Sequence, residues 1–76
     1  MEKETRVRVW LQLAYMMSVE SDALAYKFPR DASDDPEIER CRAAGDRFYE
    51  KAAEIAGGVL PEDAWRDAVD ALGRVR

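Results

Sequence analysis

The chain has no histidine and a single cysteine, Cys41. One cysteine excludes an intrachain disulfide, and the lack of histidine excludes a zinc site built from cysteine and histidine. It also removes the side chain that most often carries acid-base catalysis near neutral pH. Without a histidine to activate it, Cys41 is expected to be a small buried hydrophobic residue. We therefore predict a protein that is not an enzyme and that needs no metal or other cofactor.

Long apolar runs are also missing, and no stretch approaches the roughly 20 apolar residues that a membrane helix needs. The N-terminal segment is charged, so the sequence predicts neither a signal peptide nor a membrane contact, and the cytoplasm is the expected location. Basic charge is in deficit, because 12 Lys and Arg stand against 16 Asp and Glu for a net charge of −4. Direct binding of nucleic acid depends on neutralising phosphates, so this balance disfavours it and favours a protein partner.

The length of 76 residues predicts one helical domain over residues 1–76. A domain of this size buries only about 60% of its unfolded surface, and with no disulfide or metal to brace it, self-association is the remaining common source of stability. Hydrophobic residues make up 47% of the chain, which is enough for a core. We predict an all-α fold, either a small three-helix bundle or a helical hairpin with a long first helix, and a homodimer is one expected form.

The first helix is predicted over about residues 4–28, the longest apolar-rich part of the chain. Pro29 ends it, because proline lacks an N–H donor and disfavours helical geometry in the residue before it. A strand over residues 5–13 is the competing prediction, since apolar and polar residues alternate there. Trp10 interrupts that alternation, and no second segment looks like a partner strand. The main helical face, expected to pack inside the chain, comprises Val7, Trp10, Leu11, Leu13, Ala14, Met17, Leu24, Ala25 and Phe28.

A second apolar stripe lies about a third of a turn from the main face. Val9, Met16 and Ala23 recur every seven residues, with Val19 beside them. One packed neighbour cannot cover both faces, so we expect another protein or a second copy to cover this stripe. Tyrosine and methionine are enriched at interfaces, although partial burial is the alternative explanation for those off the main face. The residues predicted to contact a partner here are Val9, Tyr15, Met16, Val19 and Tyr26.

The second helix is predicted over about residues 36–56. Asp35 is the expected N-cap, followed by Pro36 at the first helical position, and Gly57 and Gly58 supply the left-handed conformation that closes many helices. Gly45 is expected to allow a close approach of another backbone. The inner face comprises Ile38, Cys41, Gly45, Phe48, Ala52 and Ile55.

The third helix is predicted over about residues 61–73. Pro61 is its expected first residue, with Glu62 and Asp63 favourably placed in the first turn. Trp65 and Leu72 anchor its narrow apolar face.

Acidic side chains gather along one flank of the second helix, next to a basic flank, and again in the segment 31–39. Solvated surface charge and favourable charge at a helix start explain both groups without any function. The functional interpretation is a docking face that orients a partner by complementary charge, with the acidic segment occupying a basic, nucleic-acid-binding surface of that partner. The acidic residues predicted to contact a partner are Asp31, Asp34, Asp35, Glu39, Asp46, Glu50 and Glu54.

These features favour a non-enzymatic protein-binding module. Short, acidic, helical chains recur among the proteins with which phages and mobile elements inhibit host machinery, anti-CRISPR proteins included, and the likeness is one of size and composition. The alternative is a homodimeric structural or regulatory protein whose basic ends make a weak contact with nucleic acid or another anionic ligand. The basic residues at the two ends are Lys3, Arg6, Arg8, Arg74 and Arg76.

Overall fold

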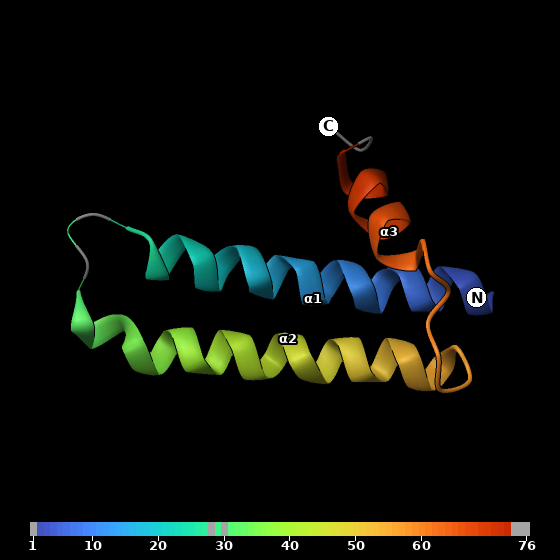
Figure 1. Ribbon diagram of the computed structural model, residues 1–76, viewed down its shortest axis with the longest axis horizontal. Helices are drawn as coiled ribbons and strands as arrows, with labels where there is room; N and C mark the ends of the chain where they lie inside the picture. Colours follow the sequence, from blue (N-terminus) through green and yellow to red (C-terminus); the bar gives the residue numbers. More distant parts are fainter. Residues whose placement is uncertain (1, 28, 30, 74–76) are drawn as a thin grey trace.

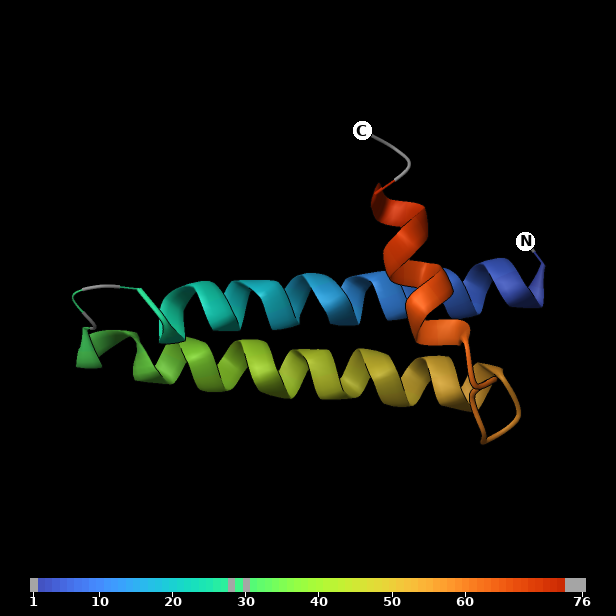
Figure 2. The ribbon, with the colours of Figure 1, turned by 45° about the horizontal axis from the view of Figure 1, so that its top comes forward.

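The computed structural model describes residues 2–27, 29 and 31–73 of the chain. Within this part, the elements are α1 (Lys3–Ala25), a 3-10 turn η1 (Ala32–Asp34), α2 (Asp35–Ile55) and α3 (Ala64–Gly73), and no strand is present. α1 and α2 run antiparallel as a hairpin, and α3 crosses α1 and points away from α2 (Figures 1 and 2). The all-α prediction is confirmed, and the alternative strand over residues 5–13 is wrong.

The best-buried part of the core lies where the three helices meet. Val7 and Leu11 of α1, Ala52 of α2 and Ala68 of α3 form one buried cluster. Further along the hairpin, α1 and α2 bury Ala14, Ile38 and Cys41. Leu11 is the only large side chain in the described residues that is fully buried, so much of the packing depends on small residues that let the helices approach closely.

α1 ends at Ala25, earlier than predicted, and the predicted core residue Phe28 lies outside the described residues. The final turn closes when the Tyr26 N–H donates to the Asp22 carbonyl at 2.9 Å. Pro29 has no N–H to offer the Ala25 carbonyl, so the helical ladder cannot continue there. The chain turns instead, and the Lys27 ammonium lies 2.6 Å from the Asp34 carboxylate.

The start of α2 differs from the prediction by one residue. Asp34 is the N-cap, Asp35 is the first helical residue and Pro36 the second, so the predicted Asp35 cap is wrong. The reason is η1, which leads directly into α2 and gives Asp34 a helical backbone without a side-chain cap. The Asp31 carboxylate caps this turn instead, accepting from the Ser33 N–H at 2.9 Å.

Gly57 and Gly58 close α2 as predicted, with φ angles of 97° and 104°. The Gly58 N–H donates to the Ala53 carbonyl at 2.8 Å, and the Gly57 N–H to the Glu54 carbonyl at 3.1 Å. These two bonds form the glycine-dependent helix end known as the Schellman motif.

α3 begins at Ala64 and not at the predicted Pro61. The Ala64 N–H donates to the Pro61 carbonyl at 3.1 Å, which makes residues 61–64 a turn ahead of the helix. Proline is favoured at the second position of such a turn and at the first position of a helix. Pro61 is instead the first residue of the turn, and the sequence pattern does not distinguish this position from the start of a helix. Glu62 and Asp63 therefore precede α3.

Gly45 faces α1, as predicted. A Cβ atom at this position would lie 3.4 Å from the Met17 Cβ and 3.5 Å from the Ala14 carbonyl oxygen. These are ordinary contact distances, so the helices are close but an alanine would also fit. The prediction that another backbone approaches Gly45 is confirmed, whereas the structure gives no steric reason for a glycine.

Candidate partner-binding surface

The outer face of α1 carries the second apolar stripe. Val9, Met16 and Val19 keep 40%, 52% and 48% of their surface exposed, and Ala23 is exposed as well. We call these four residues the α1 strip. They belong to a longer series in which steps of three and four residues alternate, the spacing with which one helix packs along another. The series comprises Val9, Gln12, Met16, Val19, Ala23 and Tyr26.

α3 borders the α1 strip without covering it. The Gln12 amide donates to the Ala68 carbonyl at 3.2 Å, which fixes α3 beside the strip. The Tyr15 ring meets the Trp65 ring edge-on, with centroids 6.1 Å apart, so Tyr15 contributes to holding α3 on α1. Tyr26, at the far end of α1, is 80% exposed. The two tyrosines predicted to bind a partner therefore have different environments.

Two packing residues are missed by the sequence pattern. Tyr49 of α2 lies 6.1 Å from the Trp65 ring, because α3 reaches the flank of α2 as well as α1. The periodicity of α2 assigns its inner face to the neighbouring Phe48 and does not single out Tyr49. Ser21 is 3% exposed, and its hydroxyl donates to the Ser18 carbonyl at 2.9 Å. Its position seven residues after buried Ala14 is the signal that marks it as a core residue.

The predicted acidic row of α2 is fully on the surface. Glu39, Asp46, Glu50 and Glu54 are all exposed, and none forms an ion pair with another described residue. At 100° per residue, this row lies nearly opposite the inner face of α2, just as the α1 strip lies nearly opposite the inner face of α1. The hairpin therefore presents an apolar surface on one side and an acidic surface on the other, and the two do not merge into one site.

The acidic segment before α2 is held by local contacts. The Asp31 carboxylate accepts from the Ser33 N–H at 2.9 Å and from the Ser33 hydroxyl at 2.8 Å, and these bonds lower the pKa of Asp31. Asp34 pairs with Lys27, and its hydrogen bond and negative charge raise the pKa of Lys27. Asp35 occupies the first turn of α2. Asp31 and Asp34 thus have structural roles in the connection between α1 and α2.

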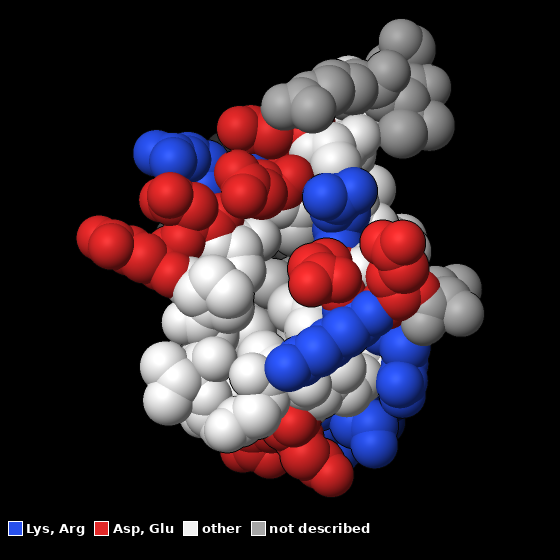
Figure 3. Space-filling model, turned by 90° about the vertical axis from the view of Figure 1, so that its right-hand side faces the viewer, with Lys and Arg blue, Asp and Glu red and all other residues white. Residues whose placement is uncertain are grey.

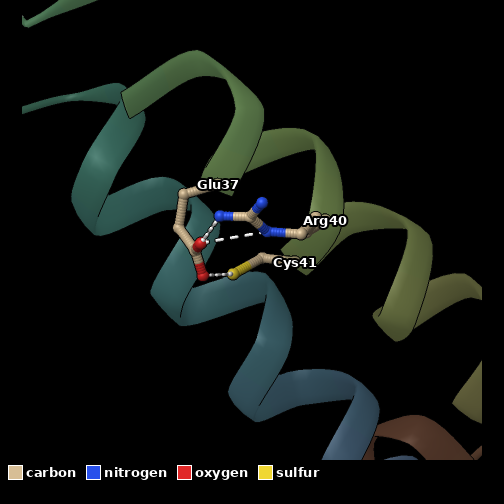
Figure 4. Close-up of polar contacts among 3 residues, drawn as sticks. All are labelled: Glu37, Arg40 and Cys41. Carbon is tan, nitrogen blue, oxygen red and sulfur yellow. Dashed lines mark hydrogen bonds and ion pairs between the residues drawn. The ribbon is translucent and has the colours of Figure 1, made fainter. Parts of the chain in front are cut away.

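Cys41 lies in a small polar cluster on α2 (Figure 4). Its Sγ lies 3.8 Å from Glu37 Oε1, while Arg40 Nε donates to Glu37 Oε2 at 3.1 Å and Arg40 Nη2 pairs with the same oxygen. Burial is the main cause that raises the pKa of the Cys41 thiol, and the bonds from Arg40 lower the pKa of Glu37. A raised thiol pKa leaves little thiolate at neutral pH, so Cys41 is a poor nucleophile.

A groove runs between the N-terminal turns of α1 and the turn before α3. Its lining includes two basic residues, Lys3 and Arg8, and four acidic ones, Glu4, Glu62, Asp63 and Asp67. Figure 3, which faces this end of the molecule, shows the two signs of charge interspersed. Arg74 and Arg76 lie outside the described residues. Because carboxylates outnumber the basic groups in the groove, its charge does not favour an anionic ligand.

Among residues 2–27, 29 and 31–73, no three His, Cys, Asp or Glu side chains lie close enough together to hold a metal ion. In the same part of the chain, no helix combines the length and apolarity needed to cross a membrane. Comparisons of the chain with protein-family models, curated proteins and solved structures find no match.

Proposed function

We propose that this protein is a non-enzymatic binding module that docks another protein surface along the α1 strip. The observation that carries the proposal is the exposure of Val9, Met16 and Val19 in a spacing suited to helix packing. Burial of exposed apolar side chains by a partner lowers the free energy. Side chains that line up along one helix can be buried together by one partner, whereas isolated surface residues cannot. Methionine is suited to such a surface because its flexible, polarizable side chain adapts to a partner.

The acidic row on α2 supports a preference for basic partners. Four exposed carboxylates, none of them paired with a basic residue in the described part of the chain, attract a basic surface and repel acidic ones, so the row adds selectivity and speeds association. Surfaces that bind nucleic acid are basic, and a small acidic module that occupies one would act as an inhibitor. An inhibitor of a host protein, made by a phage or a mobile element, is the form of this function that we propose.

The alternative is a homodimer whose basic ends contact nucleic acid or another anionic ligand. The mixed charge of the groove at the start of α1 weakens the anionic contact, because four carboxylates line the groove together with Lys3 and Arg8. The dimer does not depend on that contact and is developed below.

The substitution Met16→Asp tests the proposed function. It places a charge in the middle of the α1 strip, where burial against a partner would be unfavourable, while leaving the core unchanged because Met16 is 52% exposed. Ala43→Asp is the matched control, since it adds the same charge at an exposed position of α2. Both variants should keep the circular dichroism spectrum of the parent.

The measurement is affinity capture with the immobilised parent and both variants, followed by binding assays with the purified captured protein. We expect the parent and Ala43→Asp to bind it equally and Met16→Asp to bind it at least about tenfold more weakly. Equal binding by Met16→Asp would show that the α1 strip is not the docking surface.

A further inference from the structure

We propose that a second copy of this chain occupies the α1 strip, so that two α1 helices pack antiparallel about a two-fold axis beside Ala14. This inference rests on the proposed role of the strip in protein binding. It makes a second copy, and not a host protein, the occupant of the strip, so that a basic partner would dock on the acidic row of α2. It is carried by the way in which charge is distributed along α1 on both sides of the strip.

Between Thr5 and Ala23, the charges that border the strip divide α1 into two halves. Arg6 and Arg8 lie in the N-terminal half, and Glu20 and Asp22 lie in the C-terminal half. All four side chains are exposed, and none forms an ion pair with another described residue. Between the two halves the border is uncharged, because Leu13 and Tyr15 lie there and are half-buried.

In an antiparallel pair, the N-terminal half of one α1 lies beside the C-terminal half of the other, so opposite charges meet. With the two-fold axis beside Ala14, Val9 lies opposite the partner's Val19, and Met16 lies opposite the partner's Gln12. On one border Arg6 then faces the partner's Glu20, and on the other border Arg8 faces the partner's Asp22. The symmetry repeats both pairs, so the apolar centre is flanked at each end by complementary charge.

The charges also disfavour two competing arrangements, a parallel pair and a shifted antiparallel pair. A parallel, in-register pair would bring Arg6 and Arg8 beside the same residues of the partner, and Glu20 and Asp22 likewise, so like charges would meet at both ends. An antiparallel pair shifted by seven residues would place Arg6 opposite the partner's Lys27, so two positive charges would meet. The antiparallel arrangement also opposes the two helix dipoles favourably.

α2 packs on the inner face of α1, nearly opposite the strip. α3 crosses α1 on the neighbouring flank, where Tyr15 meets Trp65 and Gln12 donates to the Ala68 carbonyl, so a copy along the strip would meet α3 at Gln12. α3 then extends past α1 on the side away from α2 (Figures 1 and 2). The contact from Thr5 to Ala23 would be about 27 Å long at 1.5 Å per residue.

Charge reversal tests the occupant and its orientation. One variant carries Arg6→Glu and Arg8→Glu, and a second carries Glu20→Arg and Asp22→Arg. Each variant alone would place like charges opposite one another, whereas a mixture of the two restores all four attractive pairs. The control for the first variant is Arg47→Glu with Lys51→Glu, which changes the net charge equally at exposed positions of α2.

Native mass is measured by light scattering from micromolar to millimolar concentration, with circular dichroism as the check on folding. We expect the parent and the control to be dimers, and each reversed variant to dissociate with a constant raised on the order of a hundredfold. An equimolar mixture of the two reversed variants should again have the mass of a dimer. A monomeric parent, or reversed variants that dimerise as well as the parent, would overturn the inference.

Met16→Asp separates failure of this inference from failure of the proposed function. If the parent dimerises and Met16→Asp does not, while charge reversal has no effect, the strip binds protein but the antiparallel arrangement is wrong. If the dimer tolerates both Met16→Asp and charge reversal, the second copy does not occupy the strip, and the capture assay with Met16→Asp decides whether the strip binds another protein. If the parent is a monomer, the second copy is excluded, and the capture assay with Met16→Asp decides whether the strip binds another protein.

Discussion

Gly45→Ala is expected to stabilise the protein, although the glycine lies between two packed helices. An added Cβ would lie 3.4 Å from the Met17 Cβ and 3.5 Å from the Ala14 carbonyl oxygen, so neither helix has to move. Alanine is more favourable than glycine inside a helix by about 0.8 to 1 kcal/mol, and the added methyl also fills space at the contact between the helices. We therefore expect the free energy of unfolding to rise by about 0.5 to 1 kcal/mol.

The measurement is urea unfolding followed by circular dichroism, at one protein concentration so that self-association affects all variants equally. The midpoint should rise without a change in slope, and the melting temperature should rise by roughly 2 to 8 °C for a domain of this size. Ala43→Gly, at an exposed position of the same helix, is the control and should lose about 1 kcal/mol. Destabilisation by Gly45→Ala would refute the reasoning, because it would mean that α1 and α2 approach more closely than described.

Two further predictions concern the polar cluster on α2. Cys41 should react with a thiol reagent far more slowly in the folded protein than in denaturant, because it is 6% exposed and burial raises its pKa; equal rates would contradict this burial. Arg40 lowers the pKa of Glu37 from its usual value of 4.5 in the folded protein. As the pH falls, the Glu37 carboxylate is therefore protonated first in the unfolded chain. The contribution of Glu37 to stability is present above pH 4.5 and is lost below it. Urea midpoints measured from neutral to acid pH should fall less steeply for Glu37→Gln than for the parent, and parallel curves would contradict the role of this pair.

The helices and their inner faces are predictable from the sequence because burial of an apolar face fixes their periodicity. Leu11, Ile38 and Ala52 occupy the core as the spacing predicts. Gly57 and Gly58 end α2 because this helix end requires positive φ, which glycine adopts without strain. The helix starts are less predictable. Both α2 and α3 are preceded by turns that use the same aspartate and proline residues that begin helices, so local sequence does not distinguish the two uses.

The candidate surface is predictable only in part. The exposure of Val9, Met16 and Val19 follows from their place on α1, since α2 covers one face of that helix. The position of α3 does not follow from periodicity, because a short helix can cross α1 at several angles with the same small residues in contact. For this reason the sequence pattern alone does not place Tyr15 against Trp65.

The proposal that a second copy docks on the α1 strip is tested most directly by native mass. The mass of the parent and of Met16→Asp is measured across the same concentration range. We expect the parent to reach 17.4 kDa, twice the chain mass of 8.7 kDa, and Met16→Asp to stay at 8.7 kDa with an unchanged circular dichroism spectrum. A parent that stays at 8.7 kDa, or a folded Met16→Asp variant that keeps the dimer mass, would contradict it.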